Sequence, residues 1–200
     1  MSEREHLEIT ALLHHSLVMA SEPLIRFAEF QDVPTILSFI KAGAIEQHPG
    51  ACVEATEAAL IKTLHFNRAP SDPIAGSDVE QSPQFAWALL IVAPNREIAG
   101  LAIYFYNYST WRAAPGVCLE ELYVVPQYRS KGYAQLLIKA MAREAAKMGC
   151  VKMEWVCLKD NERALRFYQK IGARVMGDWV VLRVDKSGIE DLQETVVIDC

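Results

Sequence analysis

The segment best suited to chemistry is a turn, Arg129-Ser130-Lys131-Gly132-Tyr133-Ala134, that joins an apolar run to a long amphipathic pattern. A strand, a glycine turn and a helix start leave several backbone N–H groups without intrahelical partners, and the helix dipole adds positive potential there. Such a turn binds an anion, most naturally a phosphate. The residues alone also allow an ordinary strand-to-helix connection with solvated Arg129 and Lys131. Neither G-x-x-x-x-G-K-[ST] nor G-x-G-x-x-G occurs here.

The strand before this turn carries two adjacent carboxylates. Residues 117–124 are rich in β-forming side chains and contain Glu120 and Glu121. Strand alternation predicts that Glu120, Leu122 and Val124 share one face, and that Leu119, Glu121 and Tyr123 share the other. A charge on a partly solvated strand face is the simple interpretation of either glutamate. A buried, unpaired carboxylate would be costly and would therefore indicate function.

These residues resemble the GNAT superfamily of acyl-CoA N-acetyltransferases, whose pyrophosphate signature is Gln or Arg, two residues, Gly, one residue, then Gly or Ala. Here the signature is Arg129 to Ala134. The similarity runs from about Leu24 to Asp185 and is nearest to the diamine (spermidine/spermine-type) branch. The segments that carry it are 98–108, Trp111, 119–124, Asn161-Glu162 with Phe167-Tyr168, and Gly172-Ala173 with Asp178-Trp179.

The resemblance implies an acetyl-CoA site along the strand and the turn. Leu122, Tyr123 and Val124 would lie beside the pantetheine arm, with a backbone N–H near Leu122 polarising the acetyl carbonyl. The residues expected to cradle the pyrophosphate are Arg129, Ser130, Lys131, Gly132, Tyr133, Ala134 and Gln135. Asn161 is expected near the pantetheine.

The resemblance also implies the catalytic pair. Tyr168 occupies the family's tyrosine position, where a phenol can donate a proton to the departing thiolate. Tyr168 also lies on an apolar stripe with Leu165 and Ile171, which a packing residue would do as well. An amine arrives protonated at neutral pH, so a carboxylate must accept a proton before attack on the thioester. By family position that carboxylate is Glu120.

Two further glutamates are expected to contact the amine. Glu121 faces the other side of the strand, and Glu46 is the acidic residue of Ile45-Glu46-Gln47-His48 at the end of the first helix. Polyamine-acetylating relatives pair an aromatic residue with an acidic one there, and the aromatic partner is missing in this chain. This departure argues against strict polyamine specificity but not against acyl transfer. The expected acceptor is a primary amine, small or polyamine-like. Aromatic residues in 104–111 would line the amine site or pack in the core.

The surrounding periodicity predicts the elements that position these residues. Strands are expected at 24–28, 85–92, 98–108, 117–124, 151–158 and 179–184, and helices after Asp32 and Thr56, at 132–148 and at 161–171. This order predicts an α/β fold of the GNAT type (α+β in some schemes), with a mixed, mostly antiparallel sheet and helices on both faces. The two strands around the long helix should run parallel and splay apart to admit the cofactor.

The chain is predicted to contain one domain. Residues 1–23 form an N-terminal extension with the composition of a disordered segment, 24–185 the acetyltransferase domain and 186–200 a C-terminal tail. Residues 67–84 are rich in Pro, Ser, Asp and Gly and are expected to form a surface loop.

Composition limits the partners. The chain has 200 residues, 52% of them apolar and 22% charged, so it can bury a core, and no apolar run reaches the roughly 18 residues of a membrane span. A formal charge of −5 argues against nucleic acid. Five cysteines without a C-x-x-C pair favour a reducing, cytoplasmic setting and no metal site. The family resemblance suggests a homodimer.

The sequence therefore predicts an acetyl-CoA-dependent N-acetyltransferase that works by direct attack of a primary amine. Two alternatives remain open at this point. One is acetylation of protein lysines or N-termini, and the other is a catalytically silent acyl-CoA-binding module that keeps the turn without turnover.

Overall fold

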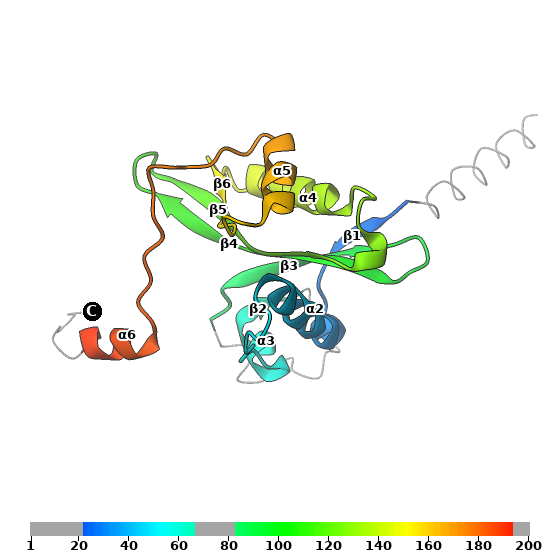
Figure 1. The fold of residues 1–200 in the computed structure, drawn as a ribbon, viewed down its shortest axis with the longest axis horizontal. Helices are drawn as coiled ribbons and strands as arrows, with labels where there is room; N and C mark the ends of the chain where they lie inside the picture. Colours follow the sequence, from blue (N-terminus) through cyan, green and yellow to red (C-terminus); the bar gives the residue numbers. More distant parts are fainter. Residues whose placement is uncertain (1–21, 67–82, 194–200) are drawn as a thin grey trace, which may run out of the picture. The chain divides into compact units, whose positions relative to one another are not determined.

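A computed structural model describes residues 22–66 and 83–193 (Figure 1). The chain divides into two compact units, Met1–Val156 and Cys157–Cys200. The first unit contains the sheet, and its elements are β1 (Leu24–Phe27), η1 (Phe30–Asp32), α2 (Val33–Gln47), α3 (Glu57–Thr63), β2 (Leu64–His65), β3 (Ala86–Val92), β4 (Ile98–Ser109), β5 (Ala114–Val124), η2 (Pro126–Tyr128), α4 (Tyr133–Lys147) and β6 (Met153–Glu154). The second unit contains α5 (Glu162–Lys170) and α6 (Lys186–Gln193).

The strands of the described residues form one mixed sheet in the order β1-β3-β4-β5-β6, with β2 added to β3. The pairs β1·β3, β3·β4 and β4·β5 are antiparallel, and β5·β6 is parallel. The sheet is mostly antiparallel and has helices on both faces, as the sequence predicted. The short strand β2 also pairs parallel with β3. The parallel pair β5·β6 is connected by α4, because parallel strands require a crossover.

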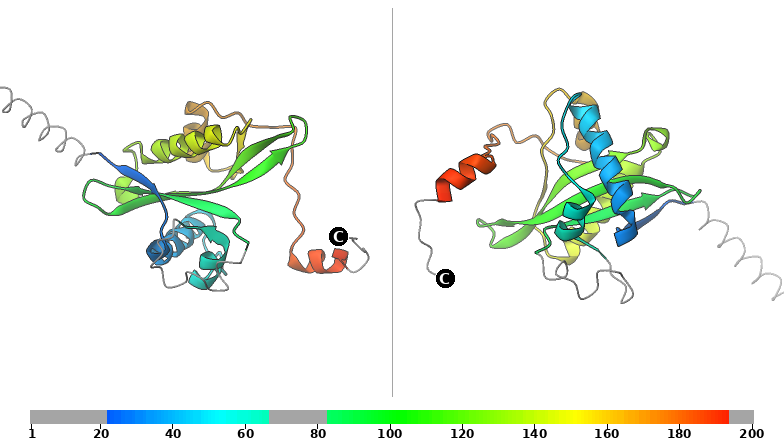
Figure 2. Two further views of the ribbon diagram at one scale, coloured as in Figure 1. Left: turned by 180° about the vertical axis from the view of Figure 1, so that it is seen from behind. Right: turned by 90° about the horizontal axis from the view of Figure 1, so that it is seen from below.

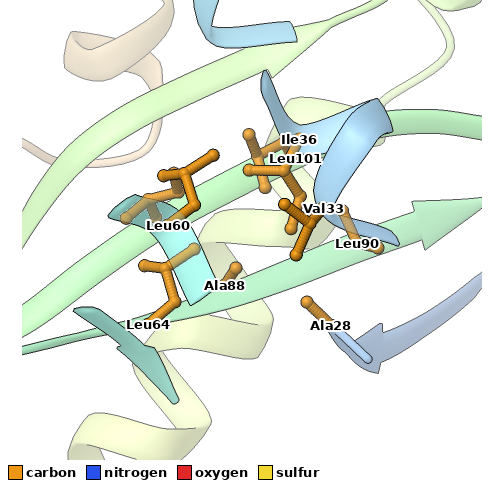
Figure 3. Packing of buried hydrophobic residues seen from close by; sticks show 9 residues of the cluster. Ala28, Val33, Ile36, Leu60, Leu64, Ala88, Leu90 and Leu101 are labelled. Atoms are coloured by element: carbon orange, nitrogen blue, oxygen red, sulfur yellow. The ribbon is translucent and has the colours of Figure 1, made fainter. Parts of the chain in front are cut away.

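Helices α2 and α3 cover one face of the sheet and α4 covers the other (Figures 1 and 2). The α2/α3 face contains a core of small and branched apolar side chains (Figure 3): Ala28, Val33, Ile36, Leu60, Leu64, Ala88, Leu90, Leu101 and Ile103. On the other face α4 buries Tyr133, Leu137, Ile138, Met141 and Ala145 at helical spacing. Burial on both faces holds the central strands β3 to β5 rigidly, as a site built on them requires.

The helix starts follow the predicted caps, with one change. The Thr56 side chain accepts a hydrogen bond from the Ala59 N–H at 3.1 Å and starts α3. Asp32 precedes α2 but does not cap it with its side chain. The buried Asp32 carboxylate instead accepts hydrogen bonds from Arg26 at 2.6 and 2.8 Å, which ties β1 to the start of α2.

Two predicted strands differ from the structure. The expected strand 151–158 is only β6, Met153–Glu154, because its pairing with β5 is confined to Val117↔Met153 and Cys118↔Glu154. The expected strand 179–184 does not form, since among the described residues no strand pairs with this segment. A β-rich composition supplies propensity, but a strand also needs a hydrogen-bonded neighbour.

The extension at residues 1–21 and most of the loop predicted at 67–84 lie outside the described residues. The domain boundaries at 23/24 and 185/186 stay predictions.

Candidate active site

The turn between β5 and α4 contains two residues with a left-handed backbone conformation. Ser130 has φ 62° and Gly132 has φ 81°, and a Cβ atom at Gly132 would meet nothing within 4 Å. Gly132 stands at the N-cap of α4, where no side chain caps the helix and no acidic residue occupies the first turn. No side chain therefore caps the first N–H groups of α4, a helix of fifteen residues, and the backbone at Gly132 next to them is open. This arrangement favours an anion.

The signature residues form one continuous surface at this turn. Ser130, Lys131, Gly132 and Gln135 are exposed, Arg129 and Ala134 are partly buried, and Tyr133 is buried against the sheet. The structure thus brings the pyrophosphate residues predicted from the sequence together on one helix start.

Arg129 connects the turn to two other elements. Its Nε donates to the Val124 carbonyl oxygen at 2.7 Å, and its Nη2 donates to the two Glu46 carboxylate oxygens at 2.6 and 2.8 Å. The guanidinium also lies over the Tyr123 ring, 5.6 Å from its centroid. Glu46, predicted to bind the amine, is therefore ion-paired with Arg129, predicted to bind the pyrophosphate. Their separation of 83 positions hid this contact from sequence reasoning.

A second connection joins the turn to the β3–β4 hairpin. The Asn95 amide donates to the Tyr128 hydroxyl at 2.7 Å, and that hydroxyl donates to Glu97. Tyr128 stacks on Tyr133 with centroids 5.9 Å apart, and Lys131 lies over the Tyr128 ring. The hydroxyl contact lowers the pKa of Glu97 and raises that of Tyr128. This contact holds the entrance to the turn, and sequence reasoning missed it because a hairpin tip carries no chemical pattern.

A β-bulge separates the two adjacent glutamates. The register of β4 and β5 runs from Ile103↔Glu121 directly to Tyr104↔Leu119, so Glu120 is the extra residue. The predicted strict alternation therefore fails here, because Leu119 and Glu121 now lie on opposite faces. Glu120 is exposed, whereas Glu121 is partly buried.

Glu121 points to the face covered by α2. Its cross-strand partner Ile103 belongs to the α2/α3 core, and a Cβ atom at Gly43 of α2 would lie 3.0 Å from Glu121 Oε1. Burial, followed by the charge of Glu120, raises the pKa of Glu121 to about 7, and the Leu122 backbone N–H opposes this rise. Glu121 can therefore hold or release a proton near neutral pH.

The outer edge of β5 is open beside these residues. Pairing with β6 ends at Cys118↔Glu154, and in the described parts of the chain no strand pairs with that edge at Leu122, Tyr123 or Val124. The pairing of the two parallel strands therefore stops before Leu122, and their splay to admit a cofactor stays a prediction. Two backbone groups in this stretch are engaged, since the Val124 carbonyl oxygen accepts from Arg129 Nε and the Leu122 N–H interacts with the Glu121 carboxylate. The remaining groups of an unpaired edge can bind an extended ligand by hydrogen bonds.

The predicted residues of the second unit lie on α5. Asn161 starts this helix, since its side chain accepts a hydrogen bond from the Ala164 N–H at 3.1 Å. Tyr168 is partly buried, and its ring centroid lies 5.2 Å from that of Phe167. The predicted roles of both residues stay predictions.

The aromatic residues of β4 divide between core and surface. Tyr104 is 1% exposed and contacts Trp87 and Tyr106, whereas Tyr108 and Trp111 are 62% and 86% exposed. Burial raises the pKa of Tyr104 strongly, so this phenol stays protonated. A separate cavity of about 210 Å³ is lined by Phe27, His65, Phe66 and Trp87.

In the described ranges 22–66 and 83–193, no three His, Cys, Asp or Glu side chains cluster in a way that could hold a metal ion.

A model of the acetyltransferase (GNAT) family matches residues 59–173, more than half of the chain. The chain belongs to this family, as the signature Arg129 to Ala134 indicated. It is therefore an acyltransferase of the GNAT type, and its matched region contains the turn, the glutamate pair and α5.

Several curated relatives are N-acetyltransferases. L-ornithine N5-acetyltransferase of Arabidopsis thaliana is 28% identical over 200 residues, covering 85% of this chain and 87% of that protein. Thialysine N-epsilon-acetyltransferase of Bos taurus is 31% identical over 98 residues, covering 48% of this chain and 57% of that protein. Spermidine/spermine N(1)-acetyltransferase-like protein 1 of Homo sapiens is 24% identical over 84% of this chain and 23% of its own length. The chain is an N-acetyltransferase that acts on amines.

Solved structures share the fold. An integron cassette protein from the mobile metagenome of V. cholerae has a TM-score of 0.63 at 18% identity, covering 86% of this chain and 98% of that one. AAC(6')-Iy, solved with a CoA-linked bisubstrate analogue, has a TM-score of 0.57 at 19% identity, covering 82% and 99%.

Proposed function

We propose that this enzyme transfers an acetyl group from acetyl-CoA to the primary amine of a small, flexible molecule such as a basic amino acid or a diamine. The relatives named for ornithine and thialysine support this acceptor class. The observation that carries the proposal is the start of α4, without a side-chain cap, next to the open edge of β5. The first feature suits a pyrophosphate and the second suits an extended arm that ends in a thioester.

The chemistry of the turn fits acetyl-CoA. Gly132 leaves the backbone open to a phosphate and Lys131 supplies positive charge beside it, whereas the guanidinium of Arg129 is paired with Glu46. Backbone N–H groups from Ser130 to Gln135 would hold the pyrophosphate, and the edge at Leu122, Tyr123 and Val124 would hold the pantetheine arm. Acetyl-CoA supplies the activated acetyl group, and these residues aim it along β5.

Two proton transfers complete the proposed reaction. A carboxylate of the Glu120–Glu121 pair accepts a proton from the ammonium group, which frees the nitrogen lone pair for attack. For Tyr168 we propose the donation of a proton to the departing sulfur, and for Asn161 a contact with the pantetheine arm. Both roles rest on the family resemblance. In the second unit Asn161 caps α5 and Tyr168 lies within it.

The acceptor is tested by supplying acetyl-CoA with ornithine, thialysine, spermidine, a lysine peptide and an N-terminal peptide. Released thiol gives the rate, and product mass spectrometry locates the acetyl group. Acetylation of the small amines with high kcat/KM is the expected result. Faster acetylation of either peptide would show a protein substrate, and binding of acetyl-CoA without any product would show a silent module.

We also propose that the enzyme is a homodimer. The second unit exposes a run of large apolar side chains that a partner surface could cover, with exposed fractions from 54% to 88%: Val175, Met176, Trp179, Val180, Val181, Leu182 and Val184. A cytoplasmic location is proposed from the cysteine pattern, and the four described cysteines are free thiols. In the part of the chain that the structure describes, no helix is long and apolar enough to cross a membrane.

A further inference from the structure

The two adjacent glutamates of β5 have different surroundings. Family position favours Glu120 as the base. In the structure Glu120 is the extra, exposed residue of the bulge, whereas Glu121 is partly buried on the face covered by α2. Glu121 packs closely against α2, since a Cβ atom at Gly43 would lie 3.0 Å from its Oε1.

We infer that Glu121 is the catalytic base that accepts the proton of the substrate ammonium group. This inference rests on the proposed function, because it names the proton acceptor of that same site. Three features of the geometry support it. The Glu121 side chain is partly buried against α2, where the absence of a side chain at Gly43 leaves room for the carboxylate. Glu121 also stands directly before Leu122, at which the edge of β5 is unpaired.

The environment gives Glu121 a pKa suited to this task. Burial and the charge of Glu120 raise its pKa to about 7, which is close to neutral pH, where a general base is most effective. The facing groups on the other elements are apolar or engaged, since β4 presents Ile103 and the α2 carboxylate Glu46 is paired with Arg129. Among the described residues, Glu120 is the charged group that acts on it.

The proton balance is complete with groups already named. Ionised Glu121 takes one proton from the ammonium nitrogen and later releases it to water. The nitrogen then forms a bond to the acetyl carbon as the carbon–sulfur bond breaks. The sulfur takes a proton from a general acid, the role that the family resemblance gives to Tyr168, and the second proton lost by the nitrogen restores that acid. The net products are the amide, the free thiol and one proton.

The pH dependence of kcat/KM for the amine tests the inference. The productive pair is ionised Glu121 with protonated amine, so the wild-type profile should be bell-shaped, with an acid limb near pH 7 and a basic limb near the amine pKa. Glu121→Gln should lose roughly 10²- to 10⁴-fold in rate, together with the acid limb. The matched Glu120→Gln variant should keep an acid limb but move it to lower pH, because it removes a charge that raises the pKa of Glu121.

Gly43→Ala is the second variant. Its methyl group would press on Glu121 Oε1 from 3.0 Å and should alter the acid limb while acetyl-CoA binding stays unchanged. Calorimetry with acetyl-CoA verifies the fold of every variant, and a carbon NMR titration of Glu121 in the free protein measures its pKa directly.

The outcomes separate the two proposals. A wild-type enzyme that acetylates no amine contradicts the proposed function. An active wild type with an acid limb that survives Glu121→Gln, or disappears in Glu120→Gln, overturns the assignment of Glu121.

Discussion

At the scale of single residues, the side chains of Glu121 and Arg129 have neighbours that their positions in the sequence did not indicate. Glu121 is buried by a helix about eighty residues earlier in the chain, and Arg129 is held by Glu46. Both contacts change the chemistry available at the site. One raises a pKa, and the other occupies a cation that the signature assigns to phosphate.

The raised pKa of Glu121 makes stability depend on pH. A folded-state pKa of about 7 against an ordinary value of 4.5 means that the protonated form is favoured in the folded protein. The free energy of unfolding therefore falls as the pH rises from about 4.5 to 7, by at most about 3 kcal/mol. Glu121→Gln should be more stable than wild type at pH 8 and nearly equal to it at pH 4, by urea denaturation. A difference independent of pH would contradict the burial described for Glu121.

Because Glu46 is paired with Arg129, Glu46 and the phosphate of acetyl-CoA should compete for the same guanidinium group. The pair is partly exposed, so it should stabilise the fold by only about 0–1 kcal/mol. Glu46→Gln frees the guanidinium and should tighten acetyl-CoA binding up to about fivefold, while the KM for the amine rises. Isothermal calorimetry and steady-state kinetics measure the two effects. Weaker acetyl-CoA binding in this variant would show that Glu46 positions Arg129 for the phosphate instead.

At the scale of elements, the glycines of the turn and of β4 have different roles. Gly132 has a positive φ with open space around it, whereas a Cβ atom at Gly100 would lie 2.7 Å from the Tyr123 carbonyl oxygen. Gly132→Ala should destabilise the fold by about 1 kcal/mol and weaken acetyl-CoA binding, because the phosphate site loses its open backbone. Gly100→Ala should cost about 3 kcal/mol, because backbone atoms cannot move aside. Denaturant titration compares them, and equal costs would contradict the open space at Gly132.

The caps of α3 and α5 offer a matched pair. Thr56→Ala and Asn161→Ala each remove a side-chain oxygen that accepts from a helix N–H, at a cost of about 1 kcal/mol. Asn161→Asp keeps the capping oxygen and should keep stability. If Asn161 also contacts the pantetheine, this variant raises the KM for acetyl-CoA although the thermal midpoint is unchanged. Full activity of Asn161→Asp would limit Asn161 to capping.

At the scale of the whole molecule, the apolar run at 175–184 predicts self-association. Leu182 is 88% exposed and Val180 79%, which is unfavourable for a surface that stays in water. Leu182→Asp should convert the proposed dimer to a monomer, measured by light scattering after gel filtration. Met148→Lys, a change at an exposed methionine at the end of α4, is the control and should leave the mass unchanged. A monomeric wild type would contradict the proposed dimer.

The sequence by itself determined helices α2 to α5, the hairpin and the turn of this protein, whereas α6 in the predicted C-terminal tail was not predicted. These features depend on interactions between residues close in the chain: the 3.6-residue pattern of α4, the caps at Thr56 and Asn161, and the glycine at 132. The residues proposed to hold the pyrophosphate could be grouped from the sequence because they are consecutive, so one local turn brings them together.

Tertiary structure alone decided which glutamate is buried, what Arg129 binds and how far β6 extends. The bulge depends on the pairing of β4 with β5, and the contact with Gly43 depends on where α2 packs. The same reason explains residues 179–184, whose β propensity produced no strand without a paired neighbour. Register and burial come from contacts between segments far apart in the chain, and no local pattern of residues encodes which segments meet.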